Sequence, residues 1–330
     1  MMSSPAISLQ SSSNSVSVIA CIDASAHARN VASVAASLAE ALDLSLTLLH
    51  VVEPGSDPGG RPDPFEWGLR RQQARRLLAR LSENLPLPAE RVRLEVAEGE
   101  RVQTICDHAA MPGSILVMGA TGHGERQPCR SHTAQQVLEA GAGPVLLVPT
   151  GQDVPRNPFG RIMVPLDGSS YAEAALAEAT RLARKSSAEL LLAHVVPDAG
   201  LILFGPPEIA DLELRLQLDQ RNEQAACNFL ERTRRRTADL GIKVRSLCLK
   251  GDTRSTLLRA IAQEKPGLVI LASRGQGGKH CHDLALGGTA AYLLAHLAGP
   301  MMLVRPAANR ADQRLRPAIQ TRHPASAFAA

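Results

Sequence analysis

The chain has 330 residues, which is enough for one large or two medium domains. Hydrophobic residues make up 45% of it and aromatic residues only 2%, so its cores must be built from Ala, Leu, Val and Ile. A net charge of +4 is too small for this length to indicate a specific nucleic-acid binder. No apolar run reaches the roughly 18 residues of a membrane span, so we expect no membrane insertion.

The two ends of the chain differ in composition from the rest. Residues 1–14 are rich in Ser and lack a basic or apolar stretch, which predicts a disordered leader rather than a signal peptide. Residues 307–330 are rich in Arg, Ala and Pro and predict a disordered tail. None of the six cysteines forms a Cys-x-x-Cys pair, and several lie in apolar runs. This pattern favours reduced core thiols in a cytoplasmic protein.

The chain reads as two copies of one pattern. An apolar run ends at Asp23 in the first half and at Asp167 in the second, 144 positions later. A second run ends in His-Val-Val in both halves, and His50 and His194 are again 144 apart. Apolar residues at helical spacing separate the two runs in each copy, which predicts an amphipathic helix there.

The rest of each copy follows the same order. Basic helical patterns cover residues 69–85 and 207–240, and third strands are predicted at 92–96 and 242–249, each followed by a glycine, Gly99 or Gly251. Fourth strands are predicted at 115–118 and 268–271, and last strands at 144–149 and 300–306. Alternating strands and helices predict an α/β fold: two copies of a five-stranded parallel open sheet with helices on both faces. We expect domains at 15–150 and 161–306, joined by a Pro-containing linker at 151–160.

A glycine-rich segment follows the fourth strand in each copy, at residues 118–133 and 272–289. In the second copy the helical pattern at 290–297 comes next. A strand that leads through a glycine loop into a helix is a common phosphate site. Glycines let backbone N–H groups approach an anion, and the helix start adds partial positive charge.

These ordered matches resemble the universal stress protein family in its tandem form, over about residues 16–306. The resemblance implies pairing of the two domains through their last strands as a pseudo-dimer, and leaves a further homodimer open. It also implies an ATP site in members with the loop pattern Gly-x2-Gly-x9-Gly-Ser/Thr. Both copies depart from that pattern: the first has His132 for the third glycine, and the second has Ala272 for the first glycine and three extra loop residues. We favour the second copy as the ATP site, because its final Gly288-Thr289 pair is intact.

The candidate nucleotide-binding residues lie at strand ends and loop ends in both copies. In the second copy they are Pro165, Leu166, Asp167, Val195, Ala272, Arg274, Gly275, Gly288, Thr289 and Ala290. In the first copy they are Asp23, Val51, Gly119, Gly122 and Thr133. Each Asp could accept a hydrogen bond from the adenosine part, as the resemblance implies, or could cap the following helix. The valines could flank the base or be core residues, and the glycines could bind phosphate or only form turns.

Three further features have alternative readings. His280, Cys281 and His282, with His123, Cys129 and His132 of the other loop, have the residue types of a zinc site, but an exposed loop explains them better. We expect structural roles for His50 and His194, and solvated faces for the Arg-rich helices.

The residues, together with the family resemblance, favour a cytoplasmic stress-response protein that binds ATP with Mg²⁺, mainly in the second domain. Its role would be regulatory or protective, with slow hydrolysis or none. No G-x-x-x-x-G-K-[ST] loop occurs, and no general base can be named, so weak ATPase activity is the most we expect. The alternative is a tandem scaffold that has lost nucleotide binding and acts through contacts with an unknown protein partner. A third reading is a small-molecule or metal sensor that uses the His and Cys loops and, as a metal sensor, would contain zinc.

Overall fold

A computed structural model describes residues 16–53, 64–120, 132–141, 143–150, 158–198, 208–275 and 286–305. The first half contains, in chain order, β1 Ser17–Cys21, α1 Ala28–Leu42, β2 Ser45–Val52, α2 Pro64–Ser82, a 3-10 turn Ala89–Arg91, β3 Val92–Glu98, α3 Arg101–His108, β4 Ile115–Gly119, α4 His132–Ala140 and β5 Val145–Val148. The second half contains β6 Arg161–Pro165, α5 Ser170–Ser186, β7 Glu189–Val196, α6 Ile209–Ala238, β8 Lys243–Lys250, α7 Thr253–Glu264, β9 Leu268–Ala272, α8 Gly288–His296 and β10 Met301–Val304.

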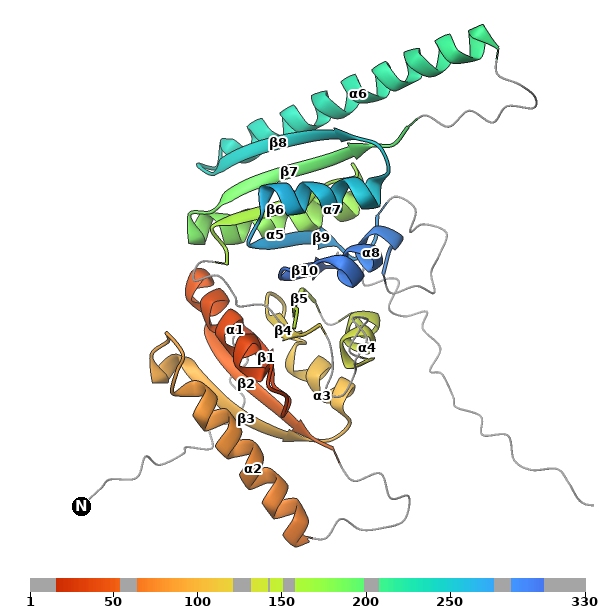
Figure 1. The fold of residues 1–330 in the computed structure, drawn as a ribbon. Coiled ribbons are helices and arrows are strands. Elements are labelled where there is room, and N and C mark those ends of the chain that lie inside the picture. Colours follow the sequence, from red (N-terminus) through yellow and green to blue (C-terminus); the bar gives the residue numbers. More distant parts are fainter. Residues whose placement is uncertain are drawn as a thin grey trace, which may run out of the picture.

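The described strands form one ten-stranded sheet in the order β3-β2-β1-β4-β5-β10-β9-β6-β7-β8 (Figure 1). All pairs within each half are parallel, which confirms the predicted α/β fold of two open parallel sheets. The halves join through β5 and β10, whose pairing is antiparallel, with Met301 opposite Leu147. The two domains thus pair through their last strands, as the family resemblance implied.

Helices cover both faces of the sheet because alternate strand residues point to opposite sides. On one face α1, α2, α5 and α6 pack on strand residues such as Val18 and Ile162. On the other face α3, α4, α7 and α8 pack on residues such as Ile19 and Met163. Each of these two cores is continuous through the β5–β10 junction, so the halves share their cores instead of having one each.

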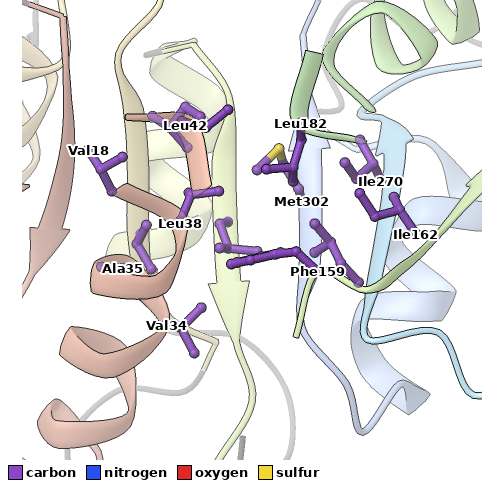
Figure 2. Close-up of a cluster of buried hydrophobic side chains, with 14 of the residues drawn as sticks. Val18, Val34, Ala35, Leu38, Leu42, Phe159, Ile162, Leu182, Ile270 and Met302 are labelled. Atoms are coloured by element: carbon purple, nitrogen blue, oxygen red, sulfur yellow. The ribbon is translucent and has the colours of Figure 1, made fainter. Parts of the chain in front are cut away.

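Phe159 lies at this junction. It stands within the predicted linker, but it is only 2% exposed and is among the largest fully buried side chains. Figure 2 shows it among Ile162, Ile270 and Met302 of the second half, with Leu38 of α1 on the facing side. The end of the predicted linker is therefore part of the core.

Local sequence signals explain the starts of three helices. The Ser169 hydroxyl accepts a hydrogen bond from Ala172 N–H and caps α5, and the Asp252 carboxylate does the same for α7 through Ser255 N–H. Helix α2 begins at Pro64, earlier than the basic pattern predicted, because proline is well suited to the first helical turn. No helix in the described ranges is both long and apolar enough to cross a membrane.

The cysteines only partly match the expectation of core thiols. Cys21, Cys106 and Cys227 are half-buried free thiols, and burial raises the pKa of Cys21 to about 12, so it stays protonated at neutral pH. Cys248 is exposed, so it is not one of the core thiols. It lies on β8, an edge strand of the sheet, where fewer neighbours cover it. Cys129 and Cys281 lie outside the described residues.

Candidate functional site

A cavity of about 510 Å³ lies at the carboxyl ends of β6, β7 and β9 in the second half. In open parallel sheets this is where ligands bind. All ten second-copy candidates line it: Pro165, Leu166, Asp167, Val195, Ala272, Arg274, Gly275, Gly288, Thr289 and Ala290. The structure therefore brings together residues that are up to 125 positions apart in the sequence (290 − 165).

Asp167 follows β6 and is held in a tight local turn. Its Oδ1 accepts hydrogen bonds from Ser169 N–H at 3.0 Å and from the Ser169 hydroxyl at 2.6 Å. The helix cap of α5 is Ser169, so the capping alternative for Asp167 is wrong. Asp167 precedes α5 in the sequence and lines the wall of the cavity.

His194 fixes the strand end from which Asp167 projects. Its Nδ1 donates to the Leu166 carbonyl oxygen at 2.7 Å, which requires the tautomer with the proton on Nδ1. His50 makes the equivalent bond to Ile22 in the first half, at 2.8 Å. The structural role predicted for both histidines is confirmed.

Gly275 comes very close to Asp167. A Cβ on Gly275 would lie 2.3 Å from Asp167 Oδ2, which is shorter than any real contact. Glycine is therefore required here by the close approach of the carboxylate, as well as by the loop itself. The second glycine of the loop and the aspartate form one unit.

The start of α8 forms the opposite wall. Gly287 N–H donates to the Ser273 carbonyl at 2.7 Å, and the first bond within the helix runs from Ala291 N–H to the Gly287 carbonyl. The N–H groups of Gly288, Thr289 and Ala290 are therefore not used by the helix, as at any helix start. Such groups, with the helix dipole, favour an anion.

Four polar residues that line the cavity were not among the sequence candidates: His194, Thr253, Arg254 and Ser273. Arg254, in the first turn of α7, reaches the start of α8, because its Nη2 lies 2.5 Å from the position of a Cβ on Gly288. Ser273 is 4% exposed, and its hydroxyl finds no hydrogen-bond partner among the described residues. The sequence gives only a weak signal for Arg254, which is the third residue after Gly251.

The remaining wall is apolar. It includes Pro165, Leu166, Ala193, Val195, Leu257, Leu271 and Leu286, and all of these except Pro165 and Leu286 are buried. The cavity thus combines one carboxylate after β6 and apolar side chains from β7, β9 and α7 with two arginines and the N–H groups at the start of α8, which the helix does not use. This arrangement suits a ligand with a flat, partly apolar body and an anionic group.

The first half repeats the geometry only in part. Asp23 Oδ1 accepts from Ser25 N–H at 3.1 Å and from the Ser25 hydroxyl at 2.5 Å, and the α1 cap is His27, so capping by Asp23 is wrong as well. Asp23 is exposed, whereas Asp167 is half-buried. Val51, Gly119 and Thr133 are half-buried, with Gly119 ending β4 and Thr133 in the first turn of α4, and Gly122 lies outside the described residues.

The proposed zinc ligands are nearly all outside the described residues as well: His123, Cys129, His280, Cys281 and His282. His132 is the first residue of α4 and is exposed. Among the described residues no group of three His, Cys, Asp or Glu side chains is placed to hold a metal ion.

The fold and the cavity together define a tandem α/β protein with a ligand crevice at the carboxyl ends of its second-half strands. The sequence model of the universal stress protein family matches twice, at residues 17–149 and 158–305. The chain belongs to this family, and the two matches confirm the tandem type.

Individual relatives agree with this assignment. The chain is 24% identical to the universal stress protein YxiE of Bacillus subtilis over 154 residues, which are 44% of this chain and 99% of that protein. A universal stress protein structure from Archaeoglobus fulgidus superposes with a TM-score of 0.58 at 18% identity, covering 88% of this chain and 96% of its own. A family structure from Arabidopsis thaliana with AMP bound matches 45% of this chain and 92% of its own, at 17% identity and a TM-score of 0.33.

Proposed function

We propose that the second-half cavity binds an adenine nucleotide, ATP, and that the bound nucleotide serves a regulatory or protective role in a stress response. The observation that supports this most is the convergence of Asp167, Gly275 and the start of α8 on one cavity. Asp167 would accept a hydrogen bond from the ribose or adenine, the apolar wall would hold the base, and the free N–H groups of α8 would bind phosphate.

The same residues argue for slow hydrolysis or none. Asp167 is the one acidic side chain among the described lining residues, and Ser169 already hydrogen-bonds to it. It is therefore poorly placed to activate a water molecule. Mg²⁺ would be held by the nucleotide phosphates and by water, because the described lining offers no cage of oxygen ligands.

Replacing Asp167 with alanine is expected to weaken ATP binding roughly tenfold to 100-fold, because a hydrogen bond to a charged group contributes about 1.5–3 kcal/mol. Asp23→Ala is the matched control, since Asp23 makes the same local turn in the other half. Isothermal titration calorimetry of the full chain with Mg-ATP measures the affinity of both variants. A larger loss for Asp23→Ala would move the site to the first domain, and no ATP binding by the unmodified protein at millimolar concentration would refute the proposal.

One observation supports the alternative of a scaffold that acts through protein contacts. The first turns of α6 expose large apolar side chains, Ile209, Leu212, Leu214 and Leu216. On this reading, replacing Leu212 and Leu216 with Glu would abolish complementation of stress survival, whereas Asp167→Ala would not. The opposite result would favour the nucleotide.

A further inference from the structure

The guanidinium of Arg254 lies against the first turn of α8. Its Nη2 is 2.5 Å, and its Cζ 3.5 Å, from the position of a Cβ on Gly288. Only a glycine at position 288 leaves room for the arginine in this conformation. The residue is exposed, and it lines the cavity from the side of α7.

This contact is electrostatically unfavourable without an anion. The start of a helix carries partial positive charge, so it repels a cation. The nearest acidic cap, Asp252, is already committed to α7, where Ser255 N–H and the Ser255 hydroxyl donate to it at 2.9 and 2.8 Å. The hydrogen bond from Ser255 N–H, the largest cause, lowers the pKa of Asp252. No ion pair of Arg254 occurs among the described residues.

A second, independent observation points to a ligand at the same place. Ser273 is buried, and its hydroxyl has no hydrogen-bond partner in the described part of the chain, although it lines this cavity. More than about 90% of buried polar groups in proteins have a partner. A ligand oxygen would satisfy this hydroxyl, and a negative one would also relieve the repulsion between Arg254 and α8.

We infer that Arg254 binds the outer phosphates of the nucleotide and makes this site prefer nucleoside di- and triphosphates over monophosphates. The inference rests on the proposed function. Asp167, Leu166 and Val195 would hold the nucleoside at the ends of β6 and β7, so the phosphate chain extends toward α7 and α8, where the arginine lies. A guanidinium can donate two parallel hydrogen bonds to phosphate oxygens.

The first half has no arginine at the equivalent position. When Gly99 is aligned with Gly251, Val102 takes the place of Arg254. The neighbouring arginine, Arg101, forms an ion pair with Glu53 instead. The inference therefore predicts that only the second half discriminates by the length of the phosphate chain.

The test is titration calorimetry of the full chain with adenosine, AMP, ADP, ATP and inorganic pyrophosphate. The unmodified protein should bind ATP at least tenfold more tightly than AMP. Arg254→Gln should remove this difference, weakening ATP about tenfold or more and leaving adenosine unchanged. Arg259→Gln, an exposed arginine on the same helix outside the cavity, is the control and should behave as the unmodified protein.

The outcomes separate the two proposals. If the Arg254→Gln protein still binds ATP more tightly than AMP, the inferred role of Arg254 is overturned. The proposal that the cavity binds a nucleotide is then unaffected. If the unmodified protein binds pyrophosphate but neither adenosine nor the adenine nucleotides, the nucleotide proposal fails. Loss of pyrophosphate binding in the Arg254→Gln protein would still support an anion site at Arg254. If the unmodified protein binds neither, both fail. If the Arg254→Gln protein also loses adenosine binding, Arg254→Lys is the further test, because lysine keeps the positive charge. The Arg254→Lys protein must then retain part of the preference for ATP over AMP, and complete loss of that preference overturns the inference.

Discussion

Replacing Gly275 with alanine is expected to weaken ATP binding about 100-fold or more. The new Cβ would lie 2.3 Å from Asp167 Oδ2, and Asp167 is itself held by Ser169, so neither side can yield easily. The overlap costs about 1–3 kcal/mol, and displacement of the carboxylate loses a hydrogen bond of about 1.5–3 kcal/mol.

Titration with Mg-ATP measures this effect, and a thermal melt of each variant shows whether it is folded. Gly299→Ala is the matched control, because a Cβ on Gly299 meets nothing within 4 Å. It should bind ATP as the unmodified protein does. A Gly275→Ala protein whose affinity changes less than threefold would show that the carboxylate and the loop do not act together.

Replacing Phe159 with alanine is expected to lower the free energy of unfolding by about 3–5 kcal/mol, the usual cost of truncating a fully buried aromatic residue. Phe159 is 2% exposed and lies where the two halves share a core (Figure 2). The cavity left by the truncation would lie at the junction, so we also expect the two halves to unfold less cooperatively.

Urea unfolding followed by circular dichroism measures both effects. The control is Phe65→Ala, because Phe65 is 80% exposed at the start of α2 and should change the free energy of unfolding by less than about 0.5 kcal/mol. Equal changes for the two variants would mean that Phe159 does not stabilise the junction.

The fold could be predicted because each copy repeats the same order of buried strands and amphipathic helices. Parallel strands place their carboxyl ends at one edge, so Asp167, Val195 and Gly275 could be predicted to lie together from strand order alone. Arg254 could not, because its position depends on how α7 packs beside α8, and no local pattern encodes that contact.

The misjudged residues have similar causes. Phe159 stands in a Pro- and Gly-containing stretch that looks like a linker, but it is buried in the core that the two halves share. Helix capping by the aspartates was the alternative to ligand binding, and it rested on residue type alone. In both halves the hydroxyl of the serine two positions later, Ser25 or Ser169, donates a hydrogen bond to the aspartate and closes a local turn. In the second half Ser169 also caps the helix.

The antiparallel junction of β5 and β10 also determines what a binding partner can reach. Within each half all strands run in the same direction, and the two halves run in opposite directions because β5 and β10 are antiparallel. Gly119, at the end of β4, and Ala272, at the end of β9, therefore lie at opposite edges of the sheet, where the strands end. A ligand in the second-half cavity and a molecule bound at the carboxyl end of β4 would therefore not compete for the same surface.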